Sequence, residues 1–204
     1  MGMIESGSTA GLVGQESMMD ARLVLEQAAR LEFDLCLEFA PTLLVPEQRI
    51  RDYCVENRCG SYNVNHMCPP RIGSLHDIAA RLDRFGQGVL LQCSRPLDVA
   101  DDWEGVTRTK LEFHRLILRL ERRLKKRGVT PVWGLMGGNC ELCLICTVVE
   151  GKPCRHPERA RTSLEAIGVD VVGLLERLGL DGRFHPDRIT WTGCILIGED
   201  QASG

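Results

Sequence analysis

The chain has 204 residues, and its 44% hydrophobic and 26% charged content is ordinary for a soluble globular protein. The formal net charge is −3 with a pI near 6.0, so the overall charge offers no attraction to nucleic acid or to an anionic membrane surface. The apolar runs are also far too short to span a bilayer, and we therefore expect neither a nucleic-acid nor a membrane partner.

The first residues, MGMIESGSTAGLVGQES, are rich in glycine and serine. They contain neither the basic n-region nor the apolar h-region of a secretory signal. We expect a flexible leader over residues 1–16, a single domain over residues 17–204 and a cytoplasmic location.

Helical and strand patterns alternate along the rest of the chain. Ser74 and Asp77 have the spacing of a capping box, and Thr162 and Glu165 repeat it, so each pair is expected to begin a helix. The expected helices cover residues 17–32, 75–85, 103–127 and 163–178, the last one interrupted at Gly168. The expected strands cover residues 33–39, 43–45, 89–93, 132–136 and 189–197.

This alternation favours a layered α/β domain with a mostly parallel sheet of four or five strands flanked by helices. In a parallel sheet, the loops that follow strands lie at the carboxyl edge. Two cysteine-rich loops, residues 54–73 and the loop after residue 136, would then meet at one edge, beside Cys93. A hairpin at residues 43–45 would instead move the first loop to the opposite edge.

The second cysteine-rich loop carries a C-x2-C-x2-C-x7-C array, formed by Cys140, Cys143, Cys146 and Cys154. Its first three cysteines have the spacing that opens the ligand run of a bacterial ferredoxin. One zinc ion holds its sulfur ligands about 3.8 Å apart and suits paired C-x2-C knuckles, whereas a cubane binds four separate irons and needs a wider spread. The array therefore favours a [4Fe–4S] cluster, with zinc as the alternative cofactor.

The first cysteine-rich loop carries a C-x4-C-x8-C-P-P pattern, formed by Cys54, Cys59 and Cys68. This pattern predicts a second metal site or a contribution to the first, so we expect one or two clusters. Three cysteines leave one coordination position open, for which Cys93, His66 or an exchangeable ligand are the alternatives. Cys93 is also interpretable as a buried strand residue.

Two further cysteines and one histidine are expected to have structural roles. Cys36 and Cys194 lie within predicted strands, where a free cysteine packs as a small apolar residue. His114 lies in the apolar part of a predicted helix and is expected to pack rather than to bind metal.

Taken together, these motifs resemble the family of predicted metal-binding proteins known as domain of unknown function 2284, which is common in anaerobic bacteria and archaea. The likeness runs from about residue 34 to 198 and includes CPP, GGNCELCLIC, GKPCRHPERAR, SLEAIGVD and ITWTGCILI. It implies metal binding through the seven cysteines of both loops, and it implies no particular reaction. The chain departs from the family pattern where Tyr62 is followed by Asn63 instead of glycine.

The sequence therefore predicts an iron–sulfur protein that transfers electrons to a redox partner protein or serves as an accessory subunit of a larger redox enzyme. Two alternatives stay open. One is an enzyme whose three-cysteine site leaves an iron open to a small substrate. The other is an interaction module that a structural zinc ion holds together.

Overall fold

A computed structural model describes residues 21–198, which form one four-stranded sheet with helices on both faces. The strand order is β1-β2-β4-β3 and every neighbouring pair is antiparallel. The strands are β1 (Leu35–Phe39), β2 (Phe85–Pro96), β3 (Val132–Leu135) and β4 (Arg188–Gly198). The helices are α2 (Gln48–Val55), α3 (Leu75–Leu82), α4 (Trp103–Lys125) and α5 (Val171–Arg177), with short 3-10 helices η1 (Pro41–Leu43) and η2 (Thr147–Glu150).

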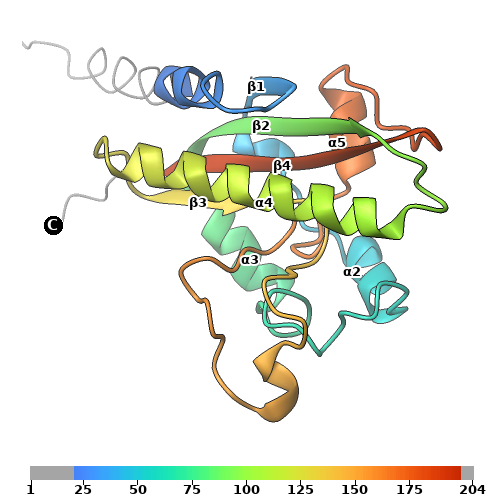
Figure 1. The fold of residues 1–204 in the computed structure, drawn as a ribbon. Coiled ribbons are helices and arrows are strands. Elements are labelled where there is room, and N and C mark those ends of the chain that lie inside the picture. Colours follow the sequence, from blue (N-terminus) through green and yellow to red (C-terminus); the bar gives the residue numbers. More distant parts are fainter. Residues whose placement is uncertain (1–20, 199–204) are drawn as a thin grey trace, which may run out of the picture.

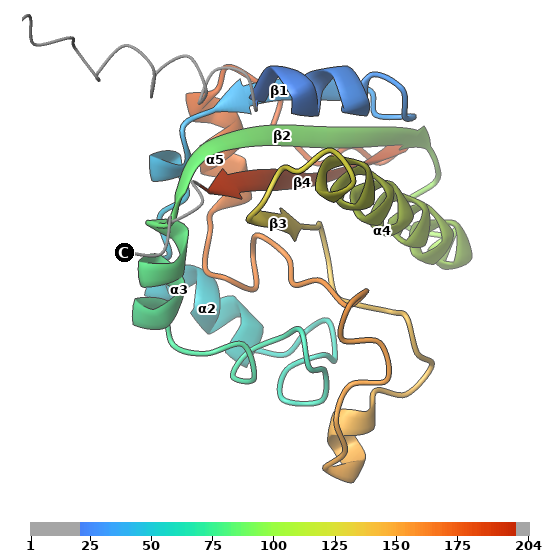
Figure 2. The ribbon, with the colours of Figure 1, turned by 90° about the vertical axis from the view of Figure 1, so that its left-hand side faces the viewer.

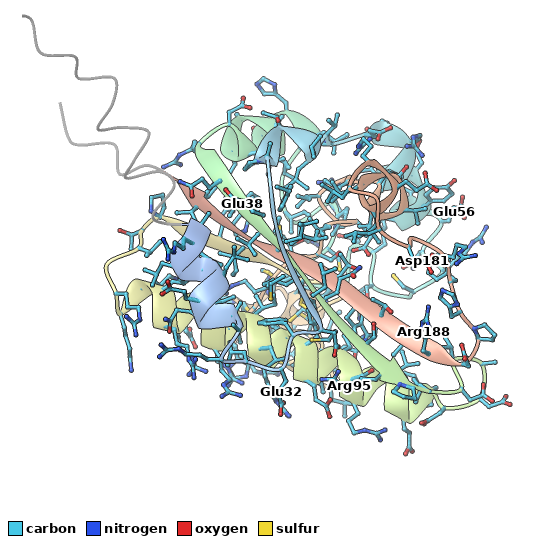
Figure 3. All side chains as sticks on the ribbon, turned by 90° about the horizontal axis from the view of Figure 1, so that it is seen from above. Glu32, Glu38, Glu56, Arg95, Asp181 and Arg188 are labelled. Carbon is cyan, nitrogen blue, oxygen red and sulfur yellow. The ribbon has the colours of Figure 1, made fainter. Side chains whose placement is uncertain are left out.

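Two hydrophobic cores lie on opposite faces of the sheet. The view from above shows the long helix α4 on one side of the sheet and further helices on the other (Figure 3). Helix α4 and the helical residues 21–28 cover one face, where Phe113 and Ile117 pack against Val89 and Ile195. Helices α3 and α5 and the segment 164–169 cover the other face, around Leu90 and neighbouring strand residues. Alternate residues of the central strands serve the two cores, as the period of a strand requires.

The helix boundaries follow local capping interactions. Ser74 and Asp77 form the expected capping box of α3, since the Ser74 hydroxyl accepts from the Asp77 N–H and the Asp77 carboxylate accepts from the Ser74 N–H. Asp102 caps α4 through the N–H of Gly105. None of the helices between residues 21 and 198 combines the length and the apolar content that a membrane span requires.

The expectation of a mostly parallel sheet is wrong. Strands β2 and β3 do run in the same direction and are joined by α4, as a β-α-β crossover predicts. They are not neighbours, because β4 inserts between them and runs the opposite way. The periodicity of a strand indicates which side chains lie on which face of the sheet, but not which strands lie beside it. The sequence pattern therefore could not predict that β4 lies between β2 and β3.

Two local predictions are also corrected. Residues 43–45 form no strand, because the chain turns through η1, and α2 was not expected. Thr162 caps no helix; the helix in this region begins only after Asp170, whose carboxylate accepts from the N–H of Gly173. The expected leader, residues 1–16, lies outside the described residues.

Candidate metal centre

The two cysteine-rich loops lie side by side beneath the β3 edge of the sheet (Figures 1 and 2). They are also hydrogen-bonded to each other. The Asn65 side-chain amide donates to the carbonyl of Cys140 at 2.8 Å, and the His66 backbone N–H donates to the sulfur of Cys146 at 3.5 Å. The loops therefore meet as predicted, but beside a lateral edge strand rather than at the carboxyl ends of parallel strands.

The cysteines of the second array line one small pocket: Cys140, Cys143, Cys146 and Cys154. The first loop supplies part of the wall through Asn65, His66 and Met67. Burial raises the pKa of the Cys140 thiol, and the backbone N–H groups of Leu142 and Arg161 oppose this shift by donating to the sulfur. A further backbone N–H, from His156, donates to the Cys154 sulfur at 3.4 Å.

The first cysteine set lies next to this pocket. Cys54 is in the last turn of α2, Cys59 is exposed in the loop that follows, and Cys68 is buried. Burial raises the pKa of Cys68 to about 12, and the charges of Cys59, Cys54, Cys140 and Cys146 add to the shift. Cys68 is therefore the member of the first set that lies within electrostatic reach of the second set.

The remaining cysteines lie apart from the two sets. Cys93 is buried in the core beneath α4, its thiol donates to the carbonyl of Glu32 at 3.3 Å, and its thiol neighbour is Cys36 in β1. Cys194 is fully buried on the other face of the sheet. These positions agree with structural roles for Cys36 and Cys194, and they remove Cys93 from the vicinity of the first set.

All ten cysteines fall within the described range, and all are free thiols. Over residues 21–198, no three His, Cys, Asp or Glu side chains are grouped closely enough to hold a metal ion as they stand. What the structure provides is a pocket with thiols around its wall and a neighbouring set of three.

A family model described as "Predicted metal-binding protein (DUF2284)" matches residues 38–197. The chain belongs to this family. The matched range holds all seven cysteines of the two sets, so the family assignment made from the sequence motifs is confirmed. The chain matches no curated protein and no solved structure.

In this member of the family, α4 fixes both ends of the second cysteine-rich loop. At the start of the loop, buried Lys110 donates to Asn139 at 2.7 Å and to Glu141 at 2.6 Å. At its end, Arg161 forms a buried ion pair with Glu121. Sequence spacing did not identify these residues, because each pair joins positions between 29 and 40 residues apart.

His114 forms a further contact between α4 and this loop. Because its imidazole is buried, we expect the folding stability of the chain to depend on pH. Its Nε2 bonds to the carbonyl of Arg159 at 2.9 Å, and burial lowers the pKa of the imidazole below 6.5. As the pH falls below about 6.5, the unfolded chain binds a proton that the folded chain does not, so folding becomes less favourable. We expect up to about 1.4 kcal/mol to be lost per pH unit in this range.

Denaturant unfolding between pH 5 and pH 8 measures this effect. The variant His114→Gln keeps a donor for the Arg159 carbonyl and should show a flatter profile below pH 6.5. The exposed His76 provides the control, and His76→Gln should retain the wild-type slope. Equal slopes for His114→Gln and the wild type would contradict the assignment.

Proposed function

We propose that the chain is a cytoplasmic iron–sulfur protein in which Cys140, Cys143, Cys146 and Cys154 hold a [4Fe–4S] cluster. The observation that carries this proposal is that these four thiols line a single pocket. Thiols spread around a pocket wall suit four separate irons better than one ion with sulfurs about 3.8 Å apart. When bound, such a cluster supplies one-electron transfer.

The surroundings of the pocket support an anionic sulfur-ligated group. Backbone N–H groups of Leu142, Arg161, His66 and His156 point at the sulfurs of three of the four cysteines. Hydrogen bonds of this kind stabilise thiolate and tune the potential of a cluster. The pocket wall also includes the apolar residues Leu142 and Ala160, which limit access of water.

The outer end of the loop supports transfer to another protein. Leu144 is fully exposed, and Ile145 and Val149 beside it are 61% and 53% exposed. In the sequence, Leu144 and Ile145 lie between the pocket cysteines Cys143 and Cys146, and Val149 follows them in the same loop. Exposed apolar groups of this size are typical of interaction surfaces, so a redox partner or a larger redox enzyme would dock within short range of the cluster.

Purification without oxygen tests the proposal. We expect iron and acid-labile sulfide in equal amounts, and an electron paramagnetic resonance signal after reduction with dithionite. Cys143→Ser should remove the iron of the pocket and its signal. The matched control is Cys36→Ser, which changes a half-buried thiol in β1 and should leave both unchanged. A colourless wild-type protein with stoichiometric zinc and no sulfide would reject the iron–sulfur function.

A further inference from the structure

A row of cations follows the outer face of α4. Residues that recur at steps of three and four positions lie in one straight row on a helix. Along α4 and its C-terminal cap, this row consists of exposed basic side chains, interrupted only by Leu111: Arg108, Arg115, Arg119, Arg122 and Lys126. A rise of 1.5 Å per residue makes the row about 27 Å long. Both ribbon views show no other element over this face among the described residues (Figures 1 and 2).

The cations of this row have no carboxylate partners within residues 21–198. None of them forms an ion pair there, and Arg122 bonds only to the Leu118 carbonyl of the same helix. The ion pairs of α4 use other residues, Lys110 and Glu121, which are buried. The whole chain nevertheless has a net charge of −3, so positive charge is concentrated on this face while the remainder of the chain is acidic. Such a concentration of one charge attracts a partner of opposite charge.

The helix dipole accounts for the C-terminal end of the row only. Cations in the last turn of a helix are stabilised by the partial negative charge at that end, and Arg122 lies in the last turn of α4. The effect does not extend beyond this turn. Because Arg108, Arg115 and Arg119 precede it, the electrostatics of the helix itself does not account for these three cations.

A shallow hollow of about 310 Å³ lies at the N-terminal end of the row. Its lining comes from α4 alone, with Trp103 and Leu111 beside Arg108 and Arg115. The Trp103 side chain is 70% exposed. Tryptophan and arginine are the side chains that most often contribute strongly to binding at protein interfaces. The hollow therefore suits an apolar side chain flanked by carboxylates.

The charges around the row distinguish between classes of partner. Exposed carboxylates lie next to the hollow at the start of α4, on Asp98, Asp101 and Glu104. A nucleic acid or an anionic membrane carries negative charge over a long distance and would meet these carboxylates. A second copy of the chain, packed symmetrically on this face, would place cations against cations. A short acidic protein segment avoids both kinds of repulsion.

We propose that the outer face of α4 binds an acidic amphipathic helix of a partner protein. Carboxylates of that helix pair with Arg108, Arg115 and Arg119, and an apolar side chain enters the hollow beside Trp103. The surface lies apart from the exposed apolar residues around Leu144 (Figures 1 and 2), and it requires no bound metal. The inference therefore goes beyond the proposed iron–sulfur function. It places the partner on the same helix that fixes both ends of the second cysteine-rich loop.

Peptide binding to the purified full chain tests the proposal. The probe is a fluorescent helical peptide of about 21 residues in which Glu and Leu recur on one face. A second peptide replaces each Leu by Gln. At about 50 mM salt, where charges are weakly screened, we expect the first peptide to bind more tightly than the second. Arg115→Glu should weaken binding of both peptides about fivefold or more. Trp103→Ala should weaken binding of the first peptide only.

The matched control is Arg84→Glu, which makes the same change of charge at an exposed residue after α3, on the other side of the sheet. It should bind the peptide as the wild type does. Equal binding by Arg115→Glu and Arg84→Glu, or no binding by the wild type, overturns the assignment. Tighter binding of duplex DNA or of phosphatidylserine vesicles through Arg115 overturns the class of partner. Iron and sulfide analysis tests the pocket cluster separately, so the two proposals fail independently.

Discussion

Replacing Glu121 with alanine is expected to lower the free energy of unfolding by about 3–5 kcal/mol and to reduce the metal content as well. Glu121 accepts from the Arg161 guanidinium, and its Oε1 also accepts from the Gly134 N–H of β3 at 2.8 Å. Removing the carboxylate leaves the Gly134 N–H unpaired. It also leaves the Arg161 guanidinium, whose side chain is only 13% exposed, with the Ala160 carbonyl as its one remaining hydrogen-bond acceptor among the described residues and no counter-charge.

The loss of metal is expected because Arg161 ends the second cysteine-rich loop and its backbone N–H donates to the Cys140 sulfur. Chemical denaturation and iron analysis at low temperature measure the two effects. The double variant Glu121→Ala with Arg161→Ala should lose less stability than the sum of the single variants, because no unpaired charge remains. Glu112→Ala, on the same helix, should change stability by no more than about 0.5 kcal/mol. A strictly additive double variant would contradict the coupling.

Secondary structure was predictable here where local signals decide it. The long helix α4 and the alternating strand β4 follow from apolar periodicity, and the capping box at Ser74 fixed the start of α3. The same capping signal at Thr162 failed, because tertiary contacts use its hydroxyl to bind the Met67 carbonyl and place the chain in a β-bridge. Local propensity is overridden where such contacts form.

The sheet was not predictable from the same signals. A β-α-β order indicates that two strands are parallel, and β2 and β3 are parallel, but a strand far along the chain lies between them. The pairing of β2 with β4 joins Phe85 to Gly198, and no local pattern encodes a contact of that separation. The expected parallel direction of β2 and β3 was thus correct, whereas the expectation that these two strands are neighbours in the sheet was wrong.

For the candidate site, spacing identified the thiols but not the groups that position them. The four cysteines of the second array follow one another closely, and a short loop necessarily brings them near one pocket. The residues that support this loop, Lys110 and Glu121, belong to α4, which precedes the loop in the sequence.

Replacing Phe113 with alanine is expected to cost about 3–5 kcal/mol of folding stability as well, but through a different mechanism. Its side chain is fully buried at the centre of the α4 core and meets the Phe33 ring edge-on, with 6.2 Å between centroids. Truncation removes this contact and leaves a cavity that the packed sheet cannot fill. Phe113→Leu retains most of the volume and should lose less.

The comparison of Phe113→Ala with Glu121→Ala separates general stability from support of the metal loop. Phe113 is one residue from His114, but it belongs to the hydrophobic core on the α4 face of the sheet. Its variant should therefore keep the iron content of the wild type below its unfolding temperature. Glu121→Ala should lose iron at an equal free energy of unfolding, because it releases the segment that ends at Arg161. If both variants lose iron in proportion to their loss of stability, the loop is held by the fold as a whole and α4 has no specific role in fixing it.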